Sequence, residues 1–489
     1  MRKNPSLAGR AVLAVVLMLG FYLLALGICV TLALLLWADV QAGRVHPKLW
    51  IVAAVTIGVV AWSVWPRAAK FPDPGIRLRE DEQPALWKLV RQVAQAAGQE
   101  PPRELFLVGD VNAFVAERDS RMGFGGTRIL GIGLPLLQVL SVPQLKSVLA
   151  HEFGHFHGGD TRLGPFVYRT RDAIGRTVVN FQKAGSLMGK PFEWYGRLFL
   201  RATFAISRAQ EFAADALAVR LVGREPVQTS LRLTSEVAPL FDHYVRGEYL
   251  PVLNRNVRPP LAGGFALFLA SRAIRELQVQ VREEAMQAKG NPYDSHPPLA
   301  ERLAAAAAVE RPGSEPASGP PAIGLLRNLD ALEAKLLAFQ TGAEEVARLP
   351  AGPWHEVAVP ALLAGWSAFV DQHGRKLPAL RVADLAAQKG RLAELAAAVD
   401  PQVPEEERRG FGAWVLGVLL GVALHRAGWA VETGPGDPAY VVRGEVRLEP
   451  MAIGRSLAGG TLTEEGWAAE CARHGIGDLV LAGPDLPSG

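Results

Sequence analysis

The residues best suited to chemistry lie in the stretch HEFGHFHGG, residues 151–159, where His151, Glu152 and His155 form a His-Glu-x-x-His pattern. Two histidines four positions apart on a helix project from the same face, so both imidazoles can reach one metal ion. Glu152 is then placed to take a proton from a water bound to that ion. A five-residue pattern also arises by coincidence, so other segments must supply the supporting structure and further ligands.

The segment before this motif carries the signals of a helix start. Ser141 is a capping residue, Pro143 suits the first helical turn, and Gln144 completes a capping box. Apolar residues continue the helical spacing into His151, and the glycines at 158–159 are the expected end of the helix. The motif is therefore predicted to lie on a helix, which is the context that its chemistry requires.

A second pair of candidates, Glu211 and Asp215, lies four positions apart in the alanine-rich stretch SRAQEFAAD, residues 207–215. Catalytic zinc usually has three protein ligands, and a glutamate on a second helix is a common third one. A carboxylate one turn further along can hold a ligating imidazole in the required tautomer. Taken alone, this pair is more simply a solvated helix face. Together with the histidine motif, it completes a candidate zinc site.

Residues 1–69 predict a transmembrane hairpin. Residues 11–37 carry no charge, and residues 49–65 form a second apolar run with tryptophans near its ends. An uncleaved anchor is favoured over a signal peptide, whose apolar core is about half as long as the first run. Basic residues flank the outer ends of both runs, so the positive-inside rule places both ends, and the chain after them, in the cytoplasm.

The composition agrees with a chain that lies partly in lipid. Hydrophobic residues make up 49% of the 489 residues and charged residues 20%. The net charge of +4 is too small to predict a nucleic-acid partner. Cys29 and Cys471 are the two cysteines, so neither a disulfide framework nor a cysteine-type zinc site is expected.

Short strands are predicted at residues 105–108 and 128–133, ahead of the histidine motif. Such strands can offer an edge on which an extended peptide is bound by strand addition. From the pattern alone, an ordinary sheet edge is an equally good interpretation.

The chain resembles the HtpX and CAAX-prenyl-protease family of membrane-bound zinc metallopeptidases, and most closely its HtpX-like bacterial branch. The resemblance covers about residues 70–310 and rests on NAF (112–114), ILGIGLPLL (129–137), VLAHEFGHFHGGD (148–160), SRAQEFAAD (207–215) and SHPPLAER (295–302). It implies one zinc ion per chain held by His151, His155 and Glu211, with Glu152 as the general base and Asp215 supporting the ligands.

The resemblance implies further site residues. His296 falls where the family's histidine is thought to help stabilise the tetrahedral intermediate, and a structural role at a helix start is the alternative. Asn112 is a candidate for binding the substrate backbone, with turn formation as the alternative. We expect His157 to be structural and Asp160 to lie at a helix end or beside the ligands.

The chain also departs from the family. HtpX-type members usually carry two further spans between the zinc helices, whereas residues 178–200 here contain four charged side chains. This region instead predicts amphipathic helices lying against the domain or the membrane surface. The prenyl-protease branch has more spans than this chain, so clipping of prenylated C termini is not expected.

The predicted fold is α+β: a mainly helical zincin-type metalloprotease domain with a small sheet, preceded by the hairpin and followed by a small α/β domain. The Pro-, Gly- and Ser-rich residues 309–323 are a linker by composition, between the domain at 70–308 and that at 324–489. In the C-terminal domain, helical patterns occur at 324–346, 379–399 and 467–474. Strand patterns cover 439–448 and 478–481. The apolar run at 411–424 favours a buried core helix over a third span. We assign this domain no chemistry.

The predicted function is that of a zinc metalloendopeptidase of EC 3.4.24 type in a bacterial-type inner membrane, with its catalytic domain in the cytoplasm. Glu152 is the expected general base, and His296 the candidate donor to the oxyanion. Expected partners are the lipid bilayer and protein or peptide substrates. Misfolded membrane proteins are among these substrates, as in membrane-protein quality control.

One alternative is a membrane-tethered scaffold or regulatory protein with a structural zinc site. A general base and an open coordination position argue against it. A transporter or sensor would need charges inside the spans, and there are none.

Overall fold

The computed structural model describes residues 7–43, 45–65, 72–118, 126–155, 164–185, 187–291, 294 and 296–484. It is mainly helical with small sheets, which confirms the predicted fold class. Two compact units are present: residues 1–238 with 281–329, and residues 239–280 with 330–489. The predicted domain boundaries on either side of residues 309–323 remain predictions. The compact units follow a different division of the chain, because residues 239–280 belong to the same unit as the C-terminal part.

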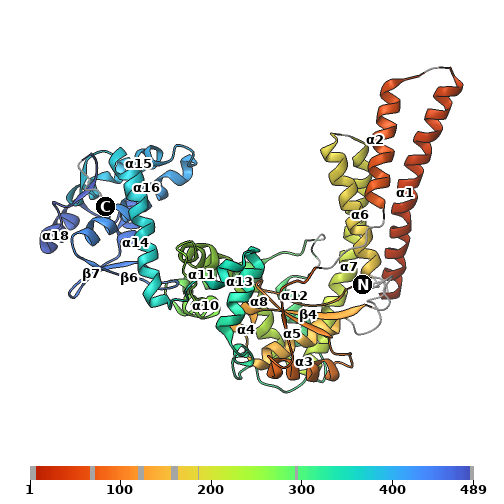
Figure 1. The fold of residues 1–489 in the computed structure, drawn as a ribbon, viewed down its shortest axis with the longest axis horizontal. Coiled ribbons are helices and arrows are strands. Elements are labelled where there is room, and N and C mark those ends of the chain that lie inside the picture. Colours follow the sequence, from red (N-terminus) through yellow and green to blue (C-terminus); the bar gives the residue numbers. More distant parts are fainter. Residues whose placement is uncertain are drawn as a thin grey trace. The chain divides into compact units, whose positions relative to one another are not determined.

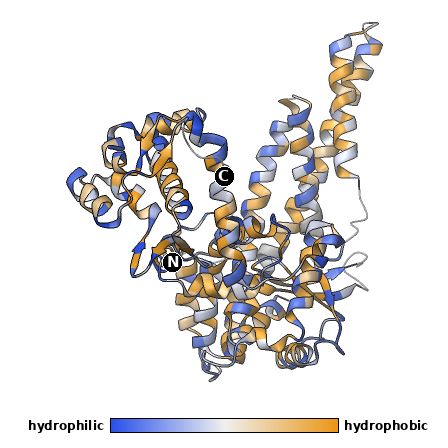
Figure 2. Cartoon of the chain, turned by 60° about the vertical axis from the view of Figure 1, so that its left-hand side comes forward, coloured by the Kyte–Doolittle hydropathy of each residue, from blue (hydrophilic) through white to orange (hydrophobic). Residues whose placement is uncertain are grey.

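Two long apolar helices, α1 (Leu7–Gln41) and α2 (Pro47–Val64), form an antiparallel hairpin (Figure 1). Among the described helices, these are the two that are long and apolar enough to cross a bilayer. Large apolar side chains such as Leu23 and Trp62, each 67% exposed, point away from the protein. The hairpin is orange over most of its length in Figure 2. Such exposure separates it from the core helices of a soluble protein and fits the predicted spans.

Helices α6 (Gly164–Lys183) and α7 (Lys190–Leu221) pack lengthwise against this hairpin. Their buried contact with it consists of Phe21, Ala25, Val60, Ala173, Ile174, Phe181, Phe192 and Phe199. The hydroxyl of Tyr195 also donates a hydrogen bond to the carbonyl of Leu17 on α1. The basic side chains of Lys183, Lys190 and Arg197 are exposed. The predicted helices over 178–200 are confirmed as parts of α6 and α7, but their buried apolar face packs along the hairpin, a contact that was not predicted.

The sheet of the first unit has the order β1-β2-β4-β3, with β2 and β4 parallel and the outer pairs antiparallel. Its strands are β1 (Ile76–Leu78), β2 (Glu104–Val108), β3 (Ala113–Arg118) and β4 (Thr127–Gly133). The strands predicted at 105–108 and 128–133 are confirmed as β2 and β4. Strand β3, which follows Asn112, is an edge strand of this sheet.

Helices α3 (Pro84–Ala96), α4 (Leu134–Val139), α5 (Val142–Gly154), α8 (Arg224–Tyr244) and α12 (Leu299–Ala307) complete the first unit around the sheet and α7. Helix α5 starts as predicted, because the Ser141 hydroxyl accepts from the Gln144 amide and the Gln144 side chain accepts from the Ser141 amide. The described helix ends at Gly154, with His155 still in helical geometry. The predicted end at 158–159 lies outside the described residues.

The proline-rich segment 309–323 is bound to the first unit. Ser314 bridges to Gly223 and Pro321 to Ser141. Glu315 also forms an ion pair of 2.9 Å with Lys146 on α5. The segment therefore makes contacts near the end of α7 and at the start of α5.

The second unit is built around α16 (Glu405–Arg426), whose residues 412–424 are buried except Trp414, so the predicted core helix is confirmed. Around it pack α14 (Trp354–His373), α15 (Leu392–Val399), α17 (Pro450–Gly459), α18 (Glu464–His474), β5 (Leu380–Arg381), β6 (Ala430–Glu432), β7 (Tyr440–Arg443), β8 (Val446–Leu448) and β9 (Val480–Ala482). The unit also contains a π-helical turn (Val245–Tyr249), α9 (Leu250–Leu253), α10 (Leu261–Ala270) and α13 (Leu329–Thr341). The division between the two units falls within α8 and within α11 (Ile274–Gln287). The single strand pattern over 439–448 is in fact the hairpin β7–β8, because Gly444, with φ 63°, turns the chain back.

Candidate metal centre and catalytic site

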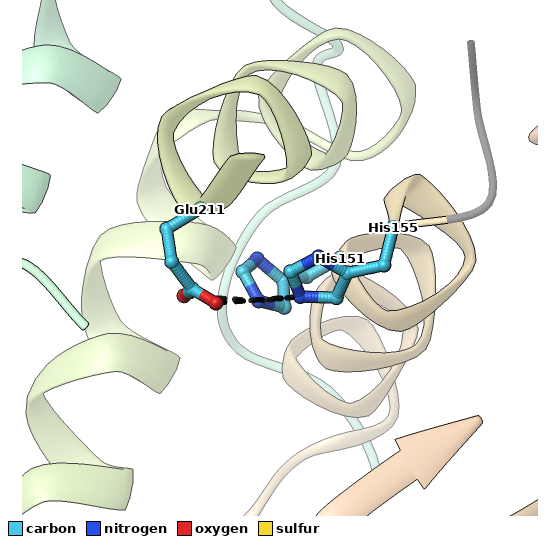
Figure 3. A group of neighbouring side chains, drawn as sticks. All are labelled: His151, His155 and Glu211. Carbon is cyan, nitrogen blue, oxygen red and sulfur yellow. Dashed lines mark hydrogen bonds and ion pairs between the residues drawn. The ribbon is translucent and has the colours of Figure 1, made fainter. Parts of the chain in front are cut away.

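The three predicted ligands converge from two helices. Nε2 of His151 and Nε2 of His155, both from α5, lie 3.2 Å apart. The Glu211 carboxylate on α7 reaches them with its two oxygens, at 3.6 Å from Nε2 of His151 and 3.5 Å from Nε2 of His155. Figure 3 shows both imidazoles turned toward this carboxylate. The structure thus brings together a His-His-Glu cluster whose ligand atoms could hold one metal ion.

The separations between these atoms fit zinc. Tetrahedral coordination with zinc–ligand distances of about 2.0–2.1 Å sets neighbouring ligand atoms roughly 3.3 Å apart. The separation of 3.2 Å between the two Nε2 atoms, and those of 3.6 and 3.5 Å from them to Oε2 and Oε1 of Glu211, are close to that value. Oε2 of Glu211 is also buried, and its nearest polar neighbours, His296 and Arg302, approach it as ion pairs that lack the alignment of a hydrogen bond. A cation at this place would satisfy that oxygen.

A glycine allows the two ligand-bearing helices to approach each other. A Cβ atom at Gly154, between Glu152 and His155, would lie 2.9 Å from Cα of Ala214 on α7. The main chain of α7 therefore leaves no room for a side chain at this position. This close contact brings Glu211 within reach of the histidines.

Asp215 and Arg302 form a support behind His151. Oδ1 of Asp215 lies 2.9 Å from Nδ1 of His151, and Asp215 is 1% exposed. Arg302, on α12, donates two hydrogen bonds of 2.8 Å to the same carboxylate. Its Nη2 also lies 3.4 Å from Oε2 of Glu211. With Nδ1 of His151 donating to Asp215, Nε2 keeps its lone pair for a metal ion.

Glu152 lines the cavity beside the ligands. No hydrogen bond or ion pair to another described residue holds its carboxylate, in contrast to Asp215 and Glu211. Burial raises the pKa of Glu152 to about 7, although the charge on His151 opposes this shift. A carboxylate with a pKa near neutrality is suited to accept and return a proton.

The other titratable groups of the site differ in their pKa values. Burial, followed by the charge on His151, lowers the pKa of His155 to about 4. Burial alone would lower the pKa of His151, but the hydrogen bond to Asp215 raises it above its ordinary value. Burial would raise the pKa of Asp215, but hydrogen bonds from Arg302 and His151 outweigh it and lower that pKa to about 2. His155 is therefore neutral and Asp215 ionised at neutral pH.

His296 and Asn112 also reach the site. Nδ1 of His296 lies 3.0 Å from Oε2 of Glu211, and its side chain is 66% exposed. Asn112 lies at the start of β3, where its carbonyl accepts a hydrogen bond from the Gly133 amide and its amide donates to Asp110. Both residues line the same cavity of about 190 Å³ as Glu152. Asn112 thus forms a turn and also faces the site, and the roles of both side chains remain predictions.

Two further candidates, His157 and Asp160, lie outside the described residues, so their predicted roles stay open. Arg302 is the last residue of the segment SHPPLAER, and no role is predicted for it from the sequence. Its burial beside two carboxylates depends on a contact with Asp215, 87 positions away, which no local spacing reveals.

Comparisons with known proteins give a consistent result. Residues 80–310 match the model of peptidase family M48. The chain is 26% identical over 198 residues to a protein named "Protease HtpX homolog" from Methanocaldococcus jannaschii, covering 37% of this chain and 68% of the relative. It is 29% identical over 188 residues to "Protease HtpX" from Yersinia enterocolitica, covering 33% and 62%.

A third relative, "Protease HtpX homolog" from Limosilactobacillus fermentum, is 27% identical over 251 residues, which cover 46% of this chain and 72% of the relative. The matched stretches thus span about two thirds of the length of these relatives. No solved structure matches the chain significantly.

Proposed function

We propose that this chain, whose residues 80–310 form an HtpX-like peptidase domain of family M48, is a membrane-anchored zinc-dependent metalloendopeptidase. The observation that carries the proposal is the convergence of His151, His155 and Glu211 at separations close to those of zinc ligands, with Glu152 at the same cavity. A structural zinc site needs four protein ligands, whereas three ligands leave one position for water or substrate.

Zinc at these ligands would supply a Lewis acid that activates water and polarises the scissile carbonyl. The chain's own contribution is the movement of protons. Glu152 accepts the proton of the attacking water and returns it to the leaving amine. Its freedom from hydrogen bonds and its raised pKa suit both steps.

The neighbouring residues position these groups. Asp215 and Arg302 hold the imidazole of His151 in one orientation and one tautomer. His296, exposed at the cavity and near Glu211, is placed to donate a hydrogen bond to the developing oxyanion. Edge strand β3 and Asn112 offer the backbone against which an extended peptide is aligned.

Helix α7 links this chemistry to the hairpin. Phe199 is the last residue of α7 in the buried contact with the hairpin, and Glu211 lies twelve positions further along the same helix. At 1.5 Å per residue, this separation is about 18 Å. We place the site on the cytoplasmic side, close to the membrane, where it acts on protein substrates in membrane-protein quality control.

The test is the substitution Glu152→Gln in the full chain, purified in detergent. Metal content should stay at one zinc per chain, while cleavage of an unfolded protein such as casein should fall by at least about a hundredfold. Glu193→Gln, on the exposed part of α7 near the hairpin, is the matched control and should cleave normally. Full activity of Glu152→Gln would refute the proposed base, and no metal-dependent cleavage by the unsubstituted chain would favour the scaffold alternative.

A further inference from the structure

The cavity beside the metal centre extends away from the ligands, between α5 and α8. On α5, Ser147 and Val148 lie one turn before His151 and Glu152 and therefore share their face of the helix. The cavity thus begins at the proposed base. A side chain next to the scissile bond would point into it.

Apolar side chains form much of its walls beyond the metal centre. They are formed by Val111, Leu136 and Val148 on one side and by Val227 and Leu231 of α8 on the other. Leu136 and Val227 are each 2% exposed, so this surface is well shielded from water. Transfer of an apolar group from water to such a surface is favourable.

The hydroxyl groups of the cavity are already engaged. Ser147 donates to the carbonyl of Gln144 at 2.7 Å, and Ser230 donates to the carbonyl of Val227 at 2.9 Å. The two hydroxyl oxygens lie 2.9 Å apart, which joins α5 to α8 beside the cavity. Thr234 likewise donates to the carbonyl of Leu231 at 3.2 Å. None of these three lining hydroxyls keeps a hydrogen free for a polar substrate group.

Charge recognition is equally disfavoured. The charged residues that line the cavity are those of the metal centre, and Asp215 and Arg302 neutralise each other there. Along the part of the wall that belongs to α8, the lining residues Val227, Ser230, Leu231 and Thr234 are uncharged. A substrate ammonium or carboxylate would therefore be buried without a partner, at a cost of several kcal/mol.

We propose that this cavity is the specificity subsite for a side chain flanking the scissile bond, and that it selects uncharged apolar side chains from leucine to phenylalanine in size. The size is bounded by the whole cavity, whose volume of about 190 Å³ includes the space beside the metal centre. In another protein, an apolar cavity of about 150 Å³ holds benzene. This inference rests on the proposed function, because the metal centre must be the place where the peptide bond is cut.

The test measures binding without turnover. Zinc-loaded full chain in detergent is titrated by calorimetry with acetohydroxamate and with peptidyl hydroxamates whose first side chain is methyl, isobutyl, benzyl or 4-aminobutyl. The isobutyl and benzyl compounds should bind at least about tenfold more tightly than the methyl compound, and the 4-aminobutyl compound no more tightly than methyl. Equal affinity across the four side chains would overturn the inference.

Variants on α8 test whether the side-chain preference arises at this wall of the cavity. Thr234→Phe, at a half-buried lining position, fills the cavity and should weaken the benzyl compound at least about tenfold while leaving the methyl compound within about threefold. Thr234→Val keeps the shape and should preserve the whole affinity series, because its hydroxyl is bonded within the helix. Arg232→Phe, exposed on the same helix and outside the cavity, is the control for folding.

The outcomes separate this inference from the proposed function. Acetohydroxamate has no side chain to place, so its chelator-sensitive binding reports on the metal centre alone. Its failure to bind would count against the proposed function and remove the basis of the subsite. Normal acetohydroxamate binding, with equal weakening of the methyl and benzyl compounds by Thr234→Phe, would overturn the subsite alone.

Discussion

Arg302 holds the carboxylate of Asp215 with two hydrogen bonds of 2.8 Å each, and Asp215 in turn contacts Nδ1 of His151 at 2.9 Å. The arginine lies 87 positions after the aspartate and comes from a different helix. A metal-ligand orientation that is set on α5 and α7 therefore depends on α12. This dependence leads to the first prediction.

Substitution of Arg302 by lysine should weaken zinc binding by about 10- to 100-fold, which is typical when a group that orients a ligand is lost. A lysine cannot form both hydrogen bonds, so Asp215 and the imidazole of His151 lose their fixed positions. Competition with a chelator of known affinity measures the change. Arg282→Lys is the matched control, because Arg282 also binds a carboxylate, that of Glu236, with two hydrogen bonds away from the site. Equal zinc affinities for Arg302→Lys and the unsubstituted chain would show that Arg302 only stabilises the fold.

His296→Gln separates metal binding from catalysis. We expect zinc affinity to stay within about threefold, because the three ligand atoms are provided by other residues. The kcat for peptide cleavage should fall by about 10- to 1,000-fold with a small change in KM, as expected for a donor to the oxyanion. The control is His355→Gln, whose side chain is 80% exposed in the second unit. Unchanged kcat would support the structural role at the helix start instead.

The features of the site that depend on local spacing could be predicted from the sequence. The pairs His151–His155 and Glu211–Asp215 each lie one helical turn apart, and the capping box at Ser141 fixes where α5 begins. The contact that joins these helices could not be predicted, because it depends on the absence of a side chain at Gly154 opposite Ala214. Long-range packing of this kind leaves no periodic signal.

The same distinction explains the errors in the second unit. Helix α14 (Trp354–His373) was not predicted, because Pro360 lies inside it and proline usually ends a helix. Its burial against α16, through residues such as Trp366 beside Gly421, compensates for that local cost. The core helix α16 was recognisable because its apolar run is too short to span a bilayer.

Zinc affinity should depend steeply on pH. In the metal-free protein, the hydrogen bond to Asp215 raises the pKa of His151 above its ordinary value despite burial, and burial raises the pKa of Glu152 to about 7. Both groups therefore bind protons as the pH falls. His151 must release its proton to become a zinc ligand, and the charge of the ion favours release from the neighbouring Glu152, so affinity falls as the pH falls. His155, with a pKa of about 4, does not compete in this range.

The dissociation constant should therefore change by about two log units per pH unit between pH 5 and 6. In Glu152→Gln one of the two protons is absent, so the slope should fall to about one. Calorimetry in buffers of different ionisation enthalpy counts the released protons directly. A slope of one in both proteins would show that Glu152 is already ionised without the metal.

The contact between α7 and the hairpin gives the last prediction. Phe192 is fully buried, stacks on Phe181 with ring centroids 5.7 Å apart, and contacts Phe21 of α1. Phe192→Ala should destabilise the protein by about 3 kcal/mol or more, because it leaves a cavity where three aromatic rings meet. Trp194→Ala, two positions away and 68% exposed, removes a larger side chain and should cost less than about 1 kcal/mol. Thermal unfolding in detergent compares the two, and equal losses of stability would mean that α7 does not depend on the hairpin for its position.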